Sequence, residues 1–148
     1  MYAHLLIATD GSELAGKAVE HGLELARRTG ARVTVLTVSE PVVLGTDDAF
    51  NLGVLGNLDS ELQAARERAA QELFAPLSER ASAAGVPLET RHVVDRHAAD
   101  AIVEEAEKSG CDLVVMASHG RRGLRRLLLG SQTSEVLGRS QVPVLVIR

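Results

Sequence analysis

Two glycine-containing segments carry the residue types that proteins use to bind phosphate groups. The first segment, residues 8–12, reads ATDGS, and the second, residues 118–131, reads SHGRRGLRRLLLGS. Glycine lets a backbone approach a ligand closely, and Gly130 precedes an expected helix whose first N–H groups attract anions. Arg121 and Arg122 lie between the glycines and add positive charge. Together these features favour a ligand that carries a chain of phosphates.

Each feature taken alone also has a purely structural explanation. Asp10 or Ser12 would serve to cap the first helix, and the Gly130-Ser131 pair would serve to cap the last one. A histidine directly after a strand, such as His119, is more often structural than catalytic. The occurrence of all these residues at two strand ends, rather than any single one, favours a binding site.

Sharper signatures of other functions are missing from the sequence. There is no G-x-x-x-x-G-K-[ST] phosphate loop and no G-x-G-x-x-G after the first strand. The five histidines and one cysteine do not show zinc-ligand spacing. Residues 116–120, MASHG, lack the first glycine of a nucleophile elbow, and no histidine follows them, which disfavours a small hydrolase. Three scattered aromatic residues are too few to stack nucleic-acid bases.

The composition describes an ordinary small globular protein. The 148 residues have 45% hydrophobic but only 2% aromatic content, so we expect a core of aliphatic side chains in a single domain, 1–148. A net charge of −4 argues against a binder of nucleic acid or other polyanions. The single cysteine fits a reducing compartment, and no segment reads as a signal peptide or a membrane span. We therefore expect a cytoplasmic protein that does not act at a membrane.

Apolar, β-rich runs alternate with helical patterns along the chain. Strands are expected over residues 5–9, 32–38, 88–94, 112–117 and 143–147. Helices are expected over residues 15–26, 59–84 (with a kink at Pro76), 98–109 and 131–139.

This alternation predicts an α/β fold. Near-continuous apolar strands and right-handed crossovers give one doubly wound open sheet of five parallel strands with helices on both faces. Ligands of such sheets bind beyond the carboxyl ends of the strands, where the winding reverses. The two glycine-containing segments follow the first and fourth strands, so they share one crevice if those strands are neighbours. Residues 39–58 are expected to form a long, irregular loop after the second strand.

The second segment resembles the nucleotide-binding signature of the universal stress protein family, G-x2-G-x9-G-[ST]. Ala117, Gly120 and the Gly130-Ser131 pair fit this spacing, with alanine at the first position. The resemblance covers the whole chain, including the ATDGS turn, the passage AIVEEAEKSGCDLVVMASHGRRG and the closing QVPVLVIR. It also departs from the family at Arg96 and Ala98, where glycine and proline are frequent.

The resemblance implies a role for each matching position. The first turn meets the nucleoside, with Asp10 near the ribose or a phosphate-bound metal, and the backbone of Val38 recognises adenine. The loop from Ala117 lies beneath the phosphates, and the helix start at Gly130 closes on them. The implied site residues are Ala8, Thr9, Asp10, Val38, Ala117, Ser118, His119, Gly120, Arg121, Arg122, Gly123, Gly130, Ser131, Gln132 and Thr133.

The function implied by the resemblance is that of a regulatory protein. Its ATP-binding branch binds ATP, expected here together with Mg²⁺, and has at most weak ATPase activity, for which His119 is the one candidate base. The alternative is the branch that binds no nucleotide and acts as a dimeric interaction module. In the strand order 3-2-1-4-5, the last strand lies at an edge, so we expect a homodimer through Val144, Leu145, Val146 and Ile147.

Overall fold

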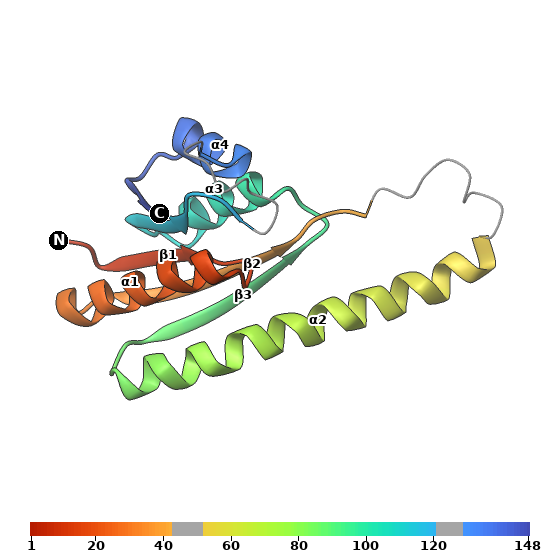
Figure 1. Cartoon of the computed structure of the whole chain (residues 1–148), viewed down its shortest axis with the longest axis horizontal. Coiled ribbons are helices and arrows are strands. Elements are labelled where there is room, and N and C mark those ends of the chain that lie inside the picture. The colour runs from red at the N-terminus through yellow and green to blue at the C-terminus, as the bar shows by residue number, and fades with distance from the viewer. Residues whose placement is uncertain (43–51, 121–128) are drawn as a thin grey trace.

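The computed structural model of this chain describes residues 1–42, 52–120 and 129–148, with the backbone alone described over 52–57. Five parallel strands form one sheet in the order β3-β2-β1-β4-β5 (Figure 1). The strands are β1 (His4–Ala8), β2 (Arg32–Ser39), β3 (Leu88–Val94), β4 (Leu113–Ala117) and β5 (Val144–Ile147). The helices are α1 (Glu13–Thr29), α2 (Leu52–Ala83), α3 (Ala98–Lys108) and α4 (Ser131–Arg139). The predicted sheet and its strand order are confirmed.

The winding of the sheet reverses beside β1. The chain proceeds from β1 outward to β2 and β3, and it then returns to place β4 on the other side of β1. In the register, Leu5 lies opposite Leu113 and Ile7 lies opposite Val115. The carboxyl ends of β1 and β4 are therefore adjacent, which places the two glycine-containing segments at the switch point of the sheet.

Helices cover both faces of the sheet, as predicted. Alternate side chains of a strand point to opposite faces. Leu5 and Ile7 accordingly pack in one apolar cluster with residues of α1 and α2, whereas Leu6 packs in a second cluster with residues of α3 and α4. Gly22 allows α1 to lie very close to β1, because a Cβ at this position would be 2.4 Å from Cδ1 of Ile7.

Defined caps mark both ends of α1. Ser12 is the N-cap residue, and its side chain accepts a hydrogen bond from the N–H of Ala15 at 3.2 Å. Gly30 follows the last helical residue with a φ of 72°, a left-handed conformation that glycine adopts without steric cost. Of the two expected cap residues, Asp10 and Ser12, the structure therefore shows Ser12 in this role.

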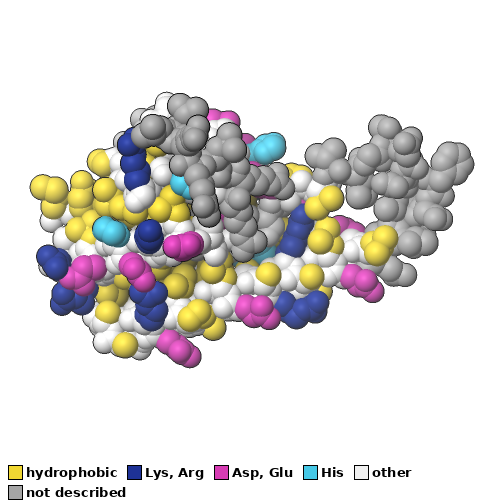
Figure 2. All heavy atoms as spheres, viewed as in Figure 1, with side chains coloured by type: hydrophobic (Ala, Val, Ile, Leu, Met, Phe, Trp, Pro, Cys, Tyr) yellow, Lys and Arg dark blue, Asp and Glu magenta, His cyan; other side chains and the backbone are white. Residues whose placement is uncertain are grey.

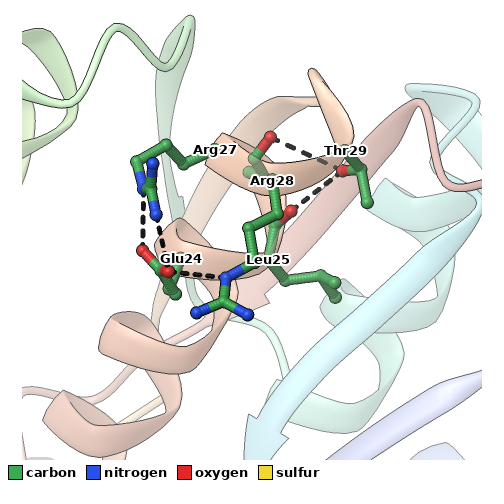
Figure 3. Close-up of polar contacts among 6 residues, drawn as sticks. Glu24, Leu25, Arg27, Arg28 and Thr29 are labelled. Atoms are coloured by element: carbon green, nitrogen blue, oxygen red, sulfur yellow. Dashed lines mark hydrogen bonds and ion pairs between the residues drawn. The ribbon is translucent and has the colours of Figure 1, made fainter.

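The last two turns of α1 carry a small cluster of charges on the surface (Figure 3). The Glu24 carboxylate accepts hydrogen bonds from Arg27 at 2.8 Å and from Arg28 at 2.6 Å. These hydrogen bonds, first from Arg27 and then from Arg28, lower the pKa of Glu24 to about 2. Thr29, the last residue of the helix, donates its hydroxyl to the Leu25 carbonyl at 2.9 Å.

We expect a carboxyl titration near pH 2 for Glu24 in a nuclear magnetic resonance experiment. The pKa is lower in the folded chain than in the unfolded chain, so this carboxylate stabilises the fold above about pH 4.5. That contribution is lost as the pH falls through about 2. The substitution Glu24→Gln should therefore lower the denaturation midpoint near neutral pH and have little effect at the acid limit. Glu79→Gln, at an exposed position of α2, is the control; an equal pH dependence in both variants would contradict the assignment.

Helix α2 begins at Leu52, so the prediction of an irregular loop up to residue 58 is wrong in its second part. Gly53 and Gly56 suggest a loop, yet each costs only about 1 kcal/mol in a helix interior. From Leu58 onward, the first buried side chain of the helix is Ala70. The helix continues through Pro76, which has no N–H to donate to the carbonyl four residues earlier. Pro76 is exposed, so this carbonyl lies near solvent. Residues 43–51 of the expected loop lie outside the described residues.

Cys111 is a free, buried cysteine in the cluster beneath α3. Burial raises the pKa of its thiol to about 11, so the thiol stays protonated near neutral pH. None of the helices in the described ranges combines the length and apolarity needed to cross a membrane. Figure 2 shows positive and negative side chains interspersed on the visible face, without a basic stripe among the described residues there.

Candidate functional site at the switch point

The turn after β1 is held in shape by its own side chains. The Thr9 hydroxyl accepts from the N–H of Gly11 at 3.2 Å, and Oδ1 of Asp10 accepts from the N–H of Ser12 at 3.0 Å. Gly11 has a φ of 76°, which explains why glycine occupies this position. Ser12 supplies the helix cap, and Oδ2 of Asp10 lies beside Gly120.

The turn after β4 lies against the first turn. A Cβ at Gly120 would be only 2.5 Å from Oδ2 of Asp10. Gly120 does not have a positive φ, so its lack of a side chain serves close approach rather than backbone conformation. The structure therefore brings the predicted residues Asp10 and Gly120 together, although they are far apart in the sequence.

Ala117 and Ser118 are buried at the end of β4 and are held by backbone contacts. The N–H of Ser118 donates to the carbonyl of Ile147 at 2.7 Å, while its hydroxyl lies 3.3 Å from Nδ1 of the partly exposed His119. Ala117 has no positive φ, so its methyl group does not strain the backbone where the family signature has glycine. The departure at Ala117 is thus accommodated in the fold of this turn.

The N-terminus of α4 closes the other side of the site. The N–H of Gly130 donates to the Ser118 carbonyl at 2.7 Å, and the Thr133 hydroxyl donates to the Ala117 carbonyl at 3.0 Å. These bonds fix the helix start against the β4 turn. Gly130 provides no capping side chain. Within the described parts of the chain, no acceptor takes the N–H groups of Ser131, Gln132 and Thr133.

The side chain of Gln132 connects α4 to α3. Its Oε1 accepts from the N–H of Ala99 at 2.8 Å and so caps the start of α3. His97, the N-cap residue of α3, makes no side-chain capping bond itself. Only the backbone N–H of Gln132 is directed along α4 toward the site. The side chain instead connects the two helices on this face of the sheet.

Val38 presents its backbone amide to the same region. In a parallel sheet, successive residues of a strand direct their N–H and C=O groups alternately to the strand on one side and the strand on the other. The carbonyl of Leu36 on β2 accepts from the N–H of Thr9, on the β1 side, at 2.9 Å. Val38 therefore directs its own N–H and C=O to the β1 side, beyond Ala8, where β1 has ended. A neighbouring donor and acceptor match the edge of a purine base that carries an amino group beside a ring nitrogen.

The remaining predicted residues are placed as follows. Ala8 is half-buried at the end of β1 and packs against the cluster beneath α3 and α4. Arg121, Arg122 and Gly123 lie outside the described residues. The described residues contain no cluster of three or more metal-ligating side chains, and Asp10 is the carboxylate at the junction of the two turns.

The arrangement suits binding better than covalent chemistry. Backbone N–H groups at a helix N-terminus bind anionic oxygens. A nearby carboxylate can bind a cation that is also coordinated by those oxygens. An exposed purine edge would meet the Val38 amide at the end of β2. These elements converge from three strand ends on one side of the sheet.

Comparison with known proteins shows the family. The model of the universal stress protein family matches residues 1–148. The chain is 33% identical over 151 residues to universal stress protein MJ0531 of Methanocaldococcus jannaschii, covering 100% of this chain and 83% of that protein. This chain belongs to the universal stress protein family.

Solved structures of the family have the same fold. Universal stress protein UspA from Lactobacillus plantarum superimposes with a TM-score of 0.85 at 25% identity, covering 99% of this chain and 98% of that one. A universal stress protein in complex with cAMP superimposes with a TM-score of 0.68 at 26% identity, covering 99% of this chain and 97% of that one. Binding of an adenine nucleotide therefore occurs within this family on the same architecture.

Proposed function

We propose that this protein is an ATP-binding regulatory module of the universal stress protein family. The observation that carries the proposal is the contact between the two glycine turns beside the start of α4. Gly120 has no room for a Cβ next to Asp10, and Gly130 is bonded to Ser118. This packing brings the start of α4 and the turn that carries Asp10 to the same end of the sheet.

Each part of ATP has a proposed partner at this end of the sheet. The phosphates accept from the N–H groups at the start of α4, with the β4 turn beneath them. The adenine edge meets the Val38 amide, and the ribose lies over the β1 turn. Mg²⁺ would be shared between phosphate oxygens and the Asp10 carboxylate, since this ion is commonly held by one or two carboxylates plus substrate phosphates.

The proposal includes at most a weak ATPase activity. His119 is the candidate base, but its Nδ1 lies 3.3 Å from the hydroxyl of Ser118. This contact joins the imidazole to an uncharged hydroxyl and not to a carboxylate that would orient it as a base. A regulatory role, in which partners respond to the bound nucleotide, is therefore favoured over rapid turnover. The proposed location is the cytoplasm, where ATP is available and the Cys111 thiol stays reduced.

Calorimetry with ATP and with adenosine tests the proposed function. ATP should bind at least about a hundredfold more tightly, because adenosine lacks two or more charge-assisted hydrogen bonds of about 1.5–3 kcal/mol each. Purified protein should also carry nucleotide, seen as excess absorbance near 260 nm. The protein's own ultraviolet absorbance is small because it has no tryptophan and one tyrosine. Absence of binding by either compound would instead favour the branch that binds no nucleotide.

A homodimer through β5 is the assembly that we propose. β5 lies at an edge of the sheet, and Leu145 on it is 37% exposed. An apolar edge strand with unpaired backbone groups is normally covered or paired. Pairing two copies of β5 about a twofold axis would satisfy both edges at once.

A further inference from the structure

Three side chains outside the proposed nucleotide site form a continuous hydrogen-bonded row. The Ser39 hydroxyl at the end of β2 lies 2.9 Å from Nε2 of His92 on β3. Nδ1 of the same imidazole lies 2.9 Å from Oε2 of Glu67 on α2. A hydroxyl, an imidazole and a carboxylate in this order are the arrangement that activates serine nucleophiles on several unrelated folds.

The fold places these side chains on the face of the sheet that α2 covers. Val35, Thr37 and Ser39 alternate with Leu36 along β2, and Val35 packs in the cluster with α1 and α2. The register sets His92 opposite Thr37, so the imidazole is a diagonal neighbour of Ser39 on that face. Glu67 reaches the imidazole from α2. The row therefore lies across the sheet from α3 and α4.

The ionised carboxylate of Glu67 determines which nitrogen of His92 carries the hydrogen. Glu67 has a lowered pKa because its side chain accepts from Gln71 and then from His92, so it stays ionised near neutral pH. An ionised carboxylate can only accept, which assigns the N–H of neutral His92 to Nδ1. Nε2 then has a free lone pair and accepts from the Ser39 hydroxyl. This is the tautomer that a general base needs.

Surrounding contacts fix each member of the row. Gln71 donates to the second oxygen of Glu67 at 2.8 Å. The backbone N–H of Asp95 donates to the carbonyl of Ser39 at 2.8 Å, and Arg66 bonds both the Asp95 carboxylate, at 2.9 Å, and the Glu40 carbonyl, at 2.8 Å. The His92 side chain is only 8% exposed, whereas Ser39 is half-buried.

We propose that Ser39 is an activated nucleophile for acyl transfer from small activated carboxylic esters, with His92 as the general base and Glu67 as a positioning residue. In the first step, Ser39 Oγ attacks the ester carbonyl while His92 Nε2 takes its proton. The bond to the alcohol then breaks, and the alcohol leaves with that proton as an acyl group remains on Ser39. In the second step, water attacks the acyl group, His92 again relays the proton, and the carboxylic acid leaves with Ser39 restored.

The test uses the whole protein without nucleotide, with p-nitrophenyl acetate and a fluorophosphonate as probes. Wild type should release p-nitrophenolate faster than buffer, and mass spectrometry should find the phosphonyl label on Ser39. Ser39→Ala and His92→Gln should each lower the protein-dependent rate at least about a hundredfold. Ser140→Ala, at a half-buried serine whose hydroxyl bonds backbone groups of Val142, is the matched control and should react as wild type does.

A second readout separates the positioning role of Glu67 from a structural one. Glu67→Gln keeps an acceptor for the imidazole but removes the negative charge that favours its protonated form. The rate should fall about tenfold, and the midpoint of its rise with pH should move to lower pH. Loss of folding alone would not move that midpoint. Circular dichroism shows whether each variant is folded. If His92→Gln does not fold, Ser39→Ala, which removes a single oxygen atom, still tests the proposal.

The proposal fails on any of three results. In the first, the fluorophosphonate does not react with wild type; in the second, the label is on another serine such as Ser118; in the third, folded Ser39→Ala hydrolyses the ester as fast as wild type does. Each of these outcomes would make the row a structural contact between β2, β3 and α2. None of them bears on ATP binding, because calorimetry with ATP measures the other site.

Discussion

The substitution Gly130→Val is expected to weaken ATP binding at least about a hundredfold while the sheet and its helices stay folded. A Cβ at Gly130 would lie 3.3 Å from both Cα of His119 and the carbonyl oxygen of Ser118, and valine adds two methyl groups beyond it. The φ of Gly130 is −59°, so the cost is one of space and not of backbone conformation. The β4 turn and the start of α4 would have to separate. Losing two charge-assisted hydrogen bonds of about 1.5–3 kcal/mol each gives the expected effect.

Gly138→Val is a matched control on the same helix. A Cβ at Gly138 meets no described atom within 4 Å, and valine is a slightly better helix former than glycine. Calorimetry of the two variants, with circular dichroism for folding, compares the same change at two positions of α4. If folded Gly130→Val binds ATP with the affinity of Gly138→Val, the phosphates do not bind at the start of α4.

The substitution Leu145→Asp is expected to convert a dimer to monomers at micromolar concentration. In a twofold interface through β5, each change appears twice. Removing a buried leucine costs about 1.5–3 kcal/mol, so the pair costs roughly 3–6 kcal/mol, or about two to four orders of magnitude in the dissociation constant. Val146 is half-buried within its own protomer, which makes Leu145 the cleaner position for this test.

Leu62→Asp provides the control for this experiment. Leu62 on α2 is 37% exposed, the same fraction as Leu145, but it lies on a different element. Sedimentation velocity should show dimers for wild type and for Leu62→Asp, and monomers for Leu145→Asp. Dimers that persist in Leu145→Asp, or a wild type that is already monomeric, would exclude β5 as the interface.

The sheet could be predicted from the sequence because its strands are short apolar runs separated by glycine and helix caps. Asp10 or Ser12 was expected to cap α1, and the structure shows Ser12 as the cap residue. The start of α2 could not be predicted in the same way. Gly53 and Gly56 suggest a break, whereas a helix tolerates two glycines when the rest of a long segment favours it.

The candidate site could be predicted where local chemistry and topology coincide, as for Asp10 and Gly120 at adjacent strand ends. The side chain of Gln132 could not be assigned, because its partner is the N–H of Ala99 on another helix. The contact between Ser39, His92 and Glu67 could not be predicted from the sequence either. These side chains are separated by 25 and 53 residues in the sequence, and the periodicity of two strands is the sole local signal that places Ser39 and His92 on one face.

The uneven burial along α2 implies that its two ends differ in resistance to local unfolding. From Leu58 to the residue before Ala70, no described side chain is buried, and Arg66 links this part to Asp95 and to the Glu40 carbonyl. Beyond Ala70, opening the helix would also expose Phe74 and other core residues. Backbone amides of the first part should thus exchange with solvent through small openings that leave the sheet intact, whereas those around Phe74 exchange only when much of the domain opens.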